Sequence, residues 1–434
     1  MTRPSTESYA ISRRRLAGML IAGGAAVLSA PGGLVTAAEP PAPQYRLRRR
    51  QYDESFWHEV REQFVIRHGL APFNAANLCP SPAPVLDRLH ELTRDIDSDP
   101  SPFNRAKLTE ARERTRTLLA QYFRVSPEEI VITRNTSEAN NMVSSGLDLG
   151  SGDEVIIFSE NHPSNNAAWK RKADRFGFAV ETVEVAKPHP GPEYYLETLA
   201  ERITDRTKVI AFTHVTNTVG DLFPAAEICA LARERGVMSL VDGAQSFGVL
   251  DVNLADMKPD FFTGSAHKWP CGPKETGVLY VNREVWDRVS PSVVSLYAGR
   301  VGISQELEAM GQRDTPAMAA LGTAIEFQLH LGQAKIEARA RELMQALVEG
   351  LRAVDGITLW TDPRPERSAA VLSFKPADLD PLRLAAALYE NDQIVCAVRA
   401  GDRPGVRLSP HLYNLHEEVE RTVAAIRRYI EREG

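Results

Sequence analysis

The chain has little cysteine, no excess of basic charge and no hydrophobic run long enough to cross a membrane. Its four cysteines among 434 residues form no CxxC pair, so we predict no metal site. Fifty-one Lys and Arg against 57 Asp and Glu give a formal net charge of −6 without a basic block, so we predict no nucleic-acid partner. An apolar run at residues 16–28 is shorter than the roughly 20 residues of a membrane span. The composition is otherwise that of a globular protein with two or three domains.

Four motifs that identify common enzyme classes are also missing. After its first 45 residues the chain has no GxGxxG turn for a nicotinamide cofactor and no GxxxxGK[ST] loop for nucleotide phosphates. It also has neither the GxSxG elbow of serine hydrolases nor the HExxH pair of zinc proteases. The chemistry of this protein must therefore depend on another set of residues.

The first 38 residues have the pattern of an export signal. Arginines at 13–15 precede the apolar run at 16–28, and small residues at 35–38 precede a Pro-rich stretch. Charged, apolar and small segments in this order are typical of a secretory signal, and paired arginines are typical of twin-arginine (Tat) export. We predict a Tat signal peptide at 1–38, export of the folded protein through the Tat translocon, and a periplasmic location. The alternative is a basic, Ala-rich leader without a targeting function.

Runs rich in β-forming residues alternate with helical stretches through the body of the chain. The runs lie at 154–158, 178–183, 208–212 and 237–241, and a helix is predicted at 225–235. This alternation predicts an α/β fold with a parallel sheet covered on both faces. Catalytic residues are then expected at the carboxyl ends of the strands.

The last 120 or so residues differ from the rest and predict an α+β unit. Helices are expected at 337–354 and 417–432, and strands at 370–374 and 406–409. We divide the chain into a signal peptide, a segment over the active site, a large domain and a small C-terminal domain, at 1–38, 39–75, 76–310 and 311–434.

Two residues in the large domain have the setting that cofactor chemistry needs. Lys268 lies beside His267 and Trp269 in a Gly- and Pro-rich turn, where burial makes a lysine nucleophilic near neutral pH. Asp242 ends an apolar strand, where a carboxylate costs free energy unless it is paired. A lysine that forms an imine and an aspartate that faces a pyridinium nitrogen are the layout of a pyridoxal-phosphate (PLP) enzyme. The alternatives are a surface lysine and an aspartate that caps a helix.

With these residues in place, the chain resembles the class-V aminotransferases, PLP enzymes related to cysteine desulfurases and isopenicillin N epimerases. The matching motifs are residues 133–140, 161–165, 214–217 and 265–268, and they occur in the order of the family. The resemblance implies PLP-dependent fold type I, in which a large domain has a mostly parallel, seven-stranded sheet and a smaller α+β domain follows. It also implies a homodimer.

The resemblance gives a role to each matching residue. Lys268 is the Schiff-base lysine and general base, Asp242 keeps the ring nitrogen protonated, and His162 stacks on the ring. The other implied cofactor contacts are Thr136, Ser137, Ser265 and His267 at the phosphate, Asn217 and Gln245 at the ring hydroxyl, and Arg313, which a partner subunit lends to the phosphate site. For the segment around Thr136, a helix cap without a ligand is the alternative.

Two further residues match substrate contacts of the family, and one family residue is missing. Arg407 matches the arginine that binds the substrate carboxylate, with an exposed strand-end arginine as the alternative. Asn77 matches a segment that folds over the site. The stretch 399–405 lacks the nucleophilic cysteine that cysteine desulfurases carry shortly before this arginine, so we predict an enzyme that is not a cysteine desulfurase.

The leader, the length and the order of the motifs resemble a Tat-exported branch of the family that matures the siderophore pyoverdine. This resemblance implies a peptide siderophore precursor as the substrate, with its glutamate residue converted toward a succinamide. A γ-linked glutamyl residue keeps the free α-amine and α-carboxylate that Lys268 and Arg407 require. Two alternatives remain: a lyase, epimerase or aminotransferase that acts on another amino acid, and a non-catalytic binding protein with the PLP fold.

Overall fold

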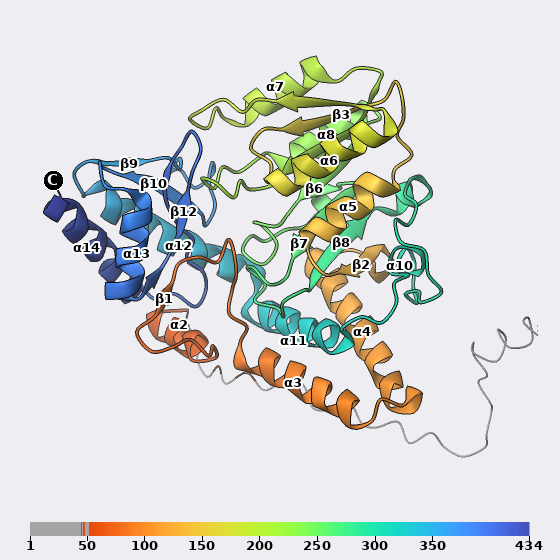
Figure 1. Cartoon of the computed structure of the whole chain (residues 1–434), viewed down its shortest axis with the longest axis horizontal. Helices are drawn as coiled ribbons and strands as arrows, with labels where there is room; N and C mark the ends of the chain where they lie inside the picture. The colour runs from red at the N-terminus through yellow and green to blue at the C-terminus, as the bar shows by residue number, and fades with distance from the viewer. Residues whose placement is uncertain (1–44, 46, 48–51, 434) are drawn as a thin grey trace, which may run out of the picture. The chain divides into compact units, whose positions relative to one another are not determined.

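Seven apolar segments form the sheet that positions the site (Figure 1). The computed structural model describes residues 45, 47 and 52–433, so the predicted signal peptide at 1–38 lies outside the described residues. In their order across the sheet the strands are β2 (Ile130–Thr133), β8 (Gly277–Val281), β7 (Phe261–Ser265), β6 (Met238–Asp242), β5 (Thr207–Thr213), β3 (Glu154–Phe158) and β4 (Ala179–Val183). Neighbouring strands are parallel except at β8, which is antiparallel to both β2 and β7. The predicted mostly parallel, seven-stranded sheet is confirmed.

The strands of this sheet are apolar on both sides because helices cover both faces. Every residue of β2, β3, β6, β7 and β8 is buried, which explains why these segments do not alternate between apolar and polar residues. One face packs with α5 (Thr136–Gly146) and α6 (Pro163–Phe176), and the other with α4 (Pro102–Phe123), α7 (Pro192–Arg202) and α8 (Ala225–Glu234).

The carboxyl ends of five strands bring the predicted site residues to one edge of the sheet. β2, β3, β5 and β7 are followed within four residues by Thr136, His162, Asn217 and His267, and β6 ends on Asp242 itself. Because β2 and the parallel strands all point the same way, these ends lie together, as the general rule for open α/β sheets expects.

A second, antiparallel sheet forms the small α+β unit. Its strands, in order, are β12 (Ala397–Arg399), β13 (Gly405–Leu408), β10 (Leu372–Pro376) and β9 (Ile357–Leu359). They share a separate apolar core with α12 (Gln333–Arg352), α13 (Pro381–Asp392) and α14 (His416–Glu433) (Figure 1). The strands predicted at 370–374 and 406–409 are β10 and β13, displaced by one or two residues.

The segment before the large sheet ties the two sheets together within one compact unit. Its strand β1 (Ala71–Pro72) pairs in parallel with β11 (Ile394–Val395), and Phe73 enters the core of the small sheet. Its helices are α2 (Glu54–Arg61) and α3 (Ala83–Ser98). α11 (Thr315–Leu331) follows the predicted domain boundary and packs against α3 and α4. Most of its residues are buried, so its apolar side chains are covered on nearly every side.

Short helices complete the described chain: η1 (Pro127–Glu129), α9 (Leu254–Met257), η2 (Arg283–Arg288) and α10 (Ser304–Leu307). Within residues 52–433, none of the helices combines the length and the apolar character that a membrane crossing requires.

Candidate active site

Lys268 lies in a tight loop after β7. Backbone hydrogen bonds close the loop, from Ala266 N to Thr276 O at 2.8 Å and from Gly272 N to Ala266 O at 2.7 Å. Burial lowers the pKa of the Lys268 ammonium, and the Asp242 carboxylate opposes this shift. A lower pKa leaves more of the lysine neutral near pH 7, which is the form that attacks an aldehyde.

Asp242 is buried at the end of β6 with neutral hydrogen-bond partners. Its residue is 2% exposed; Asn140 Nδ2 donates to Oδ2 at 3.0 Å and Ala244 N donates to Oδ1 at 3.1 Å. Asn140 is fixed in turn, because its Oδ1 accepts a hydrogen bond from Thr263 Oγ1 at 2.8 Å. A buried carboxylate with neutral partners still favours a positive charge beside it, and a pyridinium nitrogen provides one.

Asn140 was not predicted as a site residue, although it lies within the motif at 133–140. It follows Thr136 by four residues, so one helix presents the start of the phosphate site and the partner of Asp242 on the same side. That helical spacing was the signal in the sequence.

The start of α5 and the end of β7 form a group of hydrogen-bond donors. Thr136 N and Thr136 Oγ1 lie 2.9 and 2.8 Å from Ser265 Oγ, so two predicted phosphate contacts adjoin each other. The helix begins at Thr136, and the N-terminus of a helix favours an anion. Burial lowers the pKa of the nearby His267 to about 4, so its ring is neutral at pH 7 and can donate one hydrogen bond. Ser137 is exposed in the first turn.

His162 begins α6, just after the end of β3. Its Nδ1 accepts a hydrogen bond from Ser164 N at 3.2 Å, which leaves the ring proton on Nε2. Burial lowers the pKa of His162 and the Lys268 ammonium lowers it further, while the Asp242 carboxylate opposes them. The imidazole is therefore neutral and interacts electrostatically with both predicted catalytic residues, as a ring that stacks on the cofactor should.

Two arginines on neighbouring strands of the small sheet face the same carbonyl oxygen. Arg407 Nη1 on β13 and Arg399 Nη2 on β12 donate to Asn217 O at 2.8 and 3.1 Å. Arg407 Nη2 also donates to Asn74 Oδ1 at 2.8 Å. The Nε atoms of both arginines are buried without a hydrogen-bond partner among the described residues. A carboxylate, which binds guanidinium through two parallel hydrogen bonds, fits these free donors.

Arg399 was missed in the sequence as a site residue. The structure brings its charge close enough to Lys268 and His162 to lower the pKa of each. The pairing of the two strands explains why both arginines belong to the site. Arg399 opposes Gly405 and Arg407 opposes Ala397, so the two arginines lie on one face of the paired strands.

Three predicted residues have other partners in a single chain. The Gln245 side chain donates to Ala76 O and accepts from Trp269 Nε1, both at 2.9 Å. Asn77 is exposed, and it is Asn74 that contacts Arg407. Arg313 Nη1 donates to Ile132 O at 2.7 Å. The predicted contacts of Gln245 with the cofactor, of Asn77 with the substrate and of Arg313 with a partner's phosphate site stay predictions.

Comparison with known proteins places this site in a family. Residues 73–422 match the model of the family described as aminotransferase class-V. The chain therefore belongs to the class-V aminotransferases, its fold is PLP-dependent fold type I, and its cofactor is pyridoxal 5′-phosphate.

The relatives have two kinds of name. The chain is similar to isopenicillin N epimerase of Amycolatopsis lactamdurans, with 30% identity over 86% of this chain and 98% of that protein. It is also similar to a cysteine desulfurase of Salmonella agona, with 32% identity over 74% of this chain and 83% of that protein. Among solved structures, the cysteine desulfurase of Thermococcus onnurineus superimposes with a TM-score of 0.77 at 25% identity, over 86% of this chain and 98% of that one.

The arrangement of side chains determines what each would do around PLP. Thr136, Ser265 and His267 would hold the phosphate, and His162 would cover the ring. PLP, when bound, withdraws electrons from the Cα of an attached amino acid. Asp242, fixed by Asn140, would keep the ring nitrogen protonated.

Lys268 and the arginines complete the chemistry at the substrate. The Nζ of Lys268 is the amine that would bind the cofactor aldehyde, yield it to the substrate, and then accept or return the proton at Cα. The guanidinium groups of Arg407 and Arg399 would hold the substrate carboxylate. Because the carboxylate orientation fixes the rotation about the bond from nitrogen to Cα, arginines that held this carboxylate would influence which Cα bond breaks.

Proposed function

We propose that this class-V enzyme acts in the periplasm on the glutamate residue of a peptide siderophore precursor, which it converts toward a succinamide. With O2 as the oxidant the reaction balances as R–CH(NH3+)–COO− + O2 → R–CO–NH2 + CO2 + H2O, so the α-carboxyl group leaves as CO2. The observation that carries the proposal is the pair of arginines that share Asn217 O, one of which, Arg399, is close enough to Lys268 to lower its pKa. A γ-linked glutamyl residue offers a free α-amine to the lysine and a free α-carboxylate to Arg407 and Arg399. The leader, the length and the motif order, which resemble the pyoverdine-maturation enzyme PvdN, support the siderophore substrate.

The proposed reaction is not persulfide formation, although some relatives are named cysteine desulfurases. The loop between β12 and β13 contains no cysteine. Cys396 lies between β11 and β12, and burial raises its pKa to about 12. Burial also raises the pKa of Cys271 well above the usual value. Since the thiolate is the nucleophile, these protonated thiols are poorly suited to attack sulfur.

Free cysteines support export of the folded protein to the periplasm. Cys79, Cys229 and Cys271 are buried and Cys396 is half-buried, and all four are free thiols. A chain that folds in a reducing compartment before export can reach an oxidising one with buried thiols intact.

A second candidate is an epimerase or lyase for a smaller amino acid. The similarity to isopenicillin N epimerases over 86% of this chain favours it. Lys268 and Asp242 serve all of these reactions equally, so the substrate decides between the candidates.

The substrate test uses the purified protein loaded with PLP. Incubated with a pyoverdine precursor, it should change the mass of the glutamyl residue in liquid chromatography–mass spectrometry, and Lys268→Ala should abolish the change. The same protein is offered free amino acids, with chiral analysis of the products and a sulfide assay with cysteine. An unchanged precursor together with a racemised or cleaved amino acid would reject the siderophore substrate in favour of the second candidate.

Cofactor binding is tested separately from the substrate. PLP bound to Lys268 gives a yellow absorbance that borohydride removes, and mass spectrometry then finds the adduct on Lys268. A colourless protein that takes up no PLP would support the non-catalytic binding protein.

Location is tested with the full-length chain in the producing cell. Arg13→Lys with Arg14→Lys should leave an active, folded enzyme in the cytoplasm, whereas the unchanged chain should be found in the periplasmic fraction. Equal amounts of both chains in the periplasm would exclude Tat export.

A further inference from the structure

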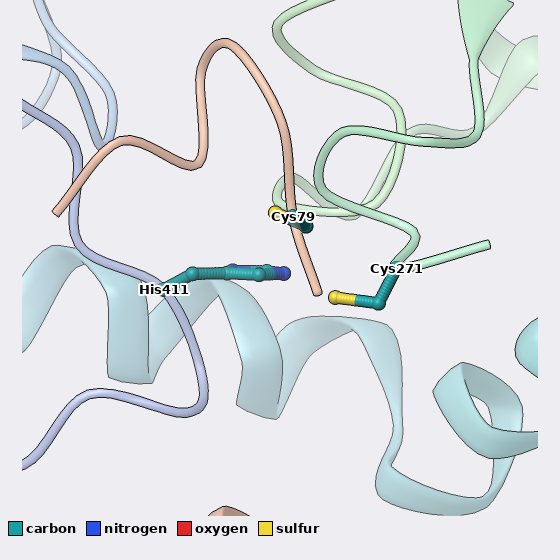
Figure 2. A group of neighbouring side chains, drawn as sticks. All are labelled: Cys79, Cys271 and His411. Atoms are coloured by element: carbon teal, nitrogen blue, oxygen red, sulfur yellow. The ribbon is translucent and has the colours of Figure 1, made fainter. Parts of the chain in front are cut away.

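Two cysteines and a histidine meet in the interior from three distant parts of the chain. Cys79 follows β1, Cys271 lies in the loop that carries Lys268, and His411 follows β13 (Figure 2). Their residues are 1%, 0% and 0% exposed, and one ligand atom from each lies within 4.8 Å of the other two. No sequence motif predicts this group, because Cys79 and Cys271 are 192 positions apart and Cys271 and His411 are 140 positions apart.

Both sulfurs and one ring nitrogen of this group have another neighbour, and Cys79 Sγ donates to Ala75 O at 3.7 Å. His411 Nε2 lies 2.6 Å from Trp269 O, while Nδ1 is buried without a hydrogen-bond partner among the described residues. Cys79 Sγ lies 3.4 Å from Tyr413 Oη, and Cys271 Sγ lies 3.4 Å from Trp269 O. Because burial keeps His411 neutral, one ring nitrogen has a lone pair for a metal ion.

We propose that Cys79, Cys271 and His411 bind one Zn²⁺ ion. Two thiolates and an imidazole are ligands that zinc prefers. Charge favours zinc as well, since two thiolates, a neutral imidazole and a divalent ion add to zero in a buried, apolar place. In a tetrahedral site with Zn–S bonds of about 2.3 Å the sulfurs are about 3.8 Å apart, so an approach of about 1 Å or less brings the two sulfurs to that separation.

Tyr413 lies beside this group and contacts two of its members. Its Oη lies 3.4 Å from Cys79 Sγ, and its ring packs edge-on against His411 at 5.5 Å between centroids. It would either bind the ion or donate a hydrogen bond to the Cys79 thiolate.

The ion would join three segments that each contact the loop of Lys268, His411 through Trp269 O. Cys79 N donates to His267 O, and Cys271 N donates to Lys268 O, both at 2.9 Å. Zinc at this place therefore has a structural role, and two thiol protons leave when it binds.

The test uses the full chain with PLP bound, reduced, treated with a chelator and then dialysed against Zn²⁺. Inductively coupled plasma mass spectrometry should find one zinc per chain, and a pH indicator should record the release of about two protons per ion. Co²⁺ in place of Zn²⁺ should give thiolate-to-metal absorption in the near ultraviolet and ligand-field bands in the red, away from the absorbance of PLP.

Variants show whether the ion is bound by these three residues. Cys79→Ala, Cys271→Ala and His411→Ala should each lose the zinc and the cobalt spectrum. Cys229→Ala is the matched control, because Cys229 is also buried but lies on α8 outside the group, and it should bind like the unchanged chain. Circular dichroism and PLP uptake confirm that each variant is folded. If a variant does not fold, the cobalt spectrum of the unchanged chain still decides whether thiolates bind the ion.

Two results would overturn the proposal. One is a chain that retains no zinc and shows no cobalt–thiolate band. The other is the loss of two thiols on exposure to a disulfide such as oxidised glutathione, with a Cys79–Cys271 disulfide in the peptide map and no metal bound; the two cysteines would then be a redox pair. Both readouts are independent of the substrate, so failure of the proposed function leaves this test unchanged.

Discussion

Asn140 is a neutral residue on which the charge of the site depends. Its amide is fixed by Thr263 and donates to Asp242 Oδ2 at 3.0 Å. We predict that Asn140→Ala weakens PLP binding by about tenfold or more, because a hydrogen bond to a charged group contributes about 1.5–3 kcal/mol and about 1.4 kcal/mol is a factor of ten. Titration of the PLP-free protein with PLP, followed by absorbance, measures the dissociation constant.

The control for this variant is its neighbour in sequence. Asn141 is exposed and its Nδ2 donates to Ser137 O at 2.9 Å. Asn141→Ala should bind PLP like the unchanged protein. Equal affinities of Asn140→Ala and the unchanged protein would show that Asp242 needs no support from Asn140.

His214 makes stability depend on pH. Burial lowers its pKa from the usual 6.5 to about 4. The folded protein keeps this ring neutral, while the unfolded chain binds a proton below pH 6.5. The contribution of His214 to the free energy of unfolding is therefore fully present above pH 6.5 and is lost as the pH falls toward 4. At about 1.4 kcal/mol per pH unit, the loss between pH 6.5 and pH 5 is about 2 kcal/mol.

Melting temperatures at pH 7 and pH 5 test this contribution. His214→Gln should lose less on acidification than the unchanged protein, because glutamine does not titrate. His68→Gln, at an exposed position, should keep the full loss. If His214→Gln lost stability as steeply as the unchanged protein, the acid sensitivity would belong to other groups.

At the scale of elements, the paired strands β12 and β13 present both arginines on one face. We predict that Arg407→Lys lowers kcat/KM by about 10- to 100-fold, since lysine retains the charge but lacks the paired donors that bind a carboxylate. Arg399→Gln should lower it as well, because Arg399 shares Asn217 O with Arg407 and its Nε is buried without a hydrogen-bond partner among the described residues. Steady-state kinetics with the identified substrate measure both effects.

A third arginine, in the loop that joins β12 and β13, provides the comparison. Arg403 pairs with Glu160 at 3.0 Å and with Asp221 at 3.6 Å, so its charge is already compensated. Arg403→Gln should leave the KM close to that of the unchanged enzyme. A KM that rises equally in all three variants would show a general effect of positive charge instead of carboxylate binding.

Elements that carry their own pattern could be predicted from the sequence. β3 is residue for residue the predicted run at 154–158, because four consecutive apolar positions, Val155 to Phe158, flanked by turns allow little else. Asp242 ends a strand and Lys268 follows one, so strand prediction located them too. Asn140, Arg399 and Asn74 could not be found this way, since their roles arise from a helix turn, a strand register and a contact over 333 residues.

At the scale of the whole molecule, local sequence patterns could not predict which residues from distant parts of the chain come together. Cys79, Cys271 and His411 carry no shared motif, and only the packing of three segments brings them together. Local spacing rules find metal sites whose ligands are close in sequence. A site whose ligands lie more than a hundred residues apart requires the fold.

The last prediction concerns the predicted homodimer, which an exposed apolar segment supports. Val294, Leu296 and Tyr297 are 86%, 95% and 62% exposed in a single chain. Neighbouring exposed apolar side chains are typical of a surface that another protein covers. Analytical ultracentrifugation should therefore give twice the chain mass, and Val294→Asp with Leu296→Asp should give a monomer, because a buried carboxylate opposes association.

The same variant tests whether a partner subunit completes the cofactor site. If Arg313 reaches the partner's phosphate site, the monomer should bind PLP more weakly than the dimer, and Arg313→Ala should weaken PLP binding without changing the mass. Val65→Asp is the control, because Val65 is 72% exposed on a separate loop after α2 and should leave a dimer with unchanged PLP affinity. A monomeric double variant with full PLP affinity would place the whole cofactor site within one chain, where Arg313 donates to Ile132 O instead.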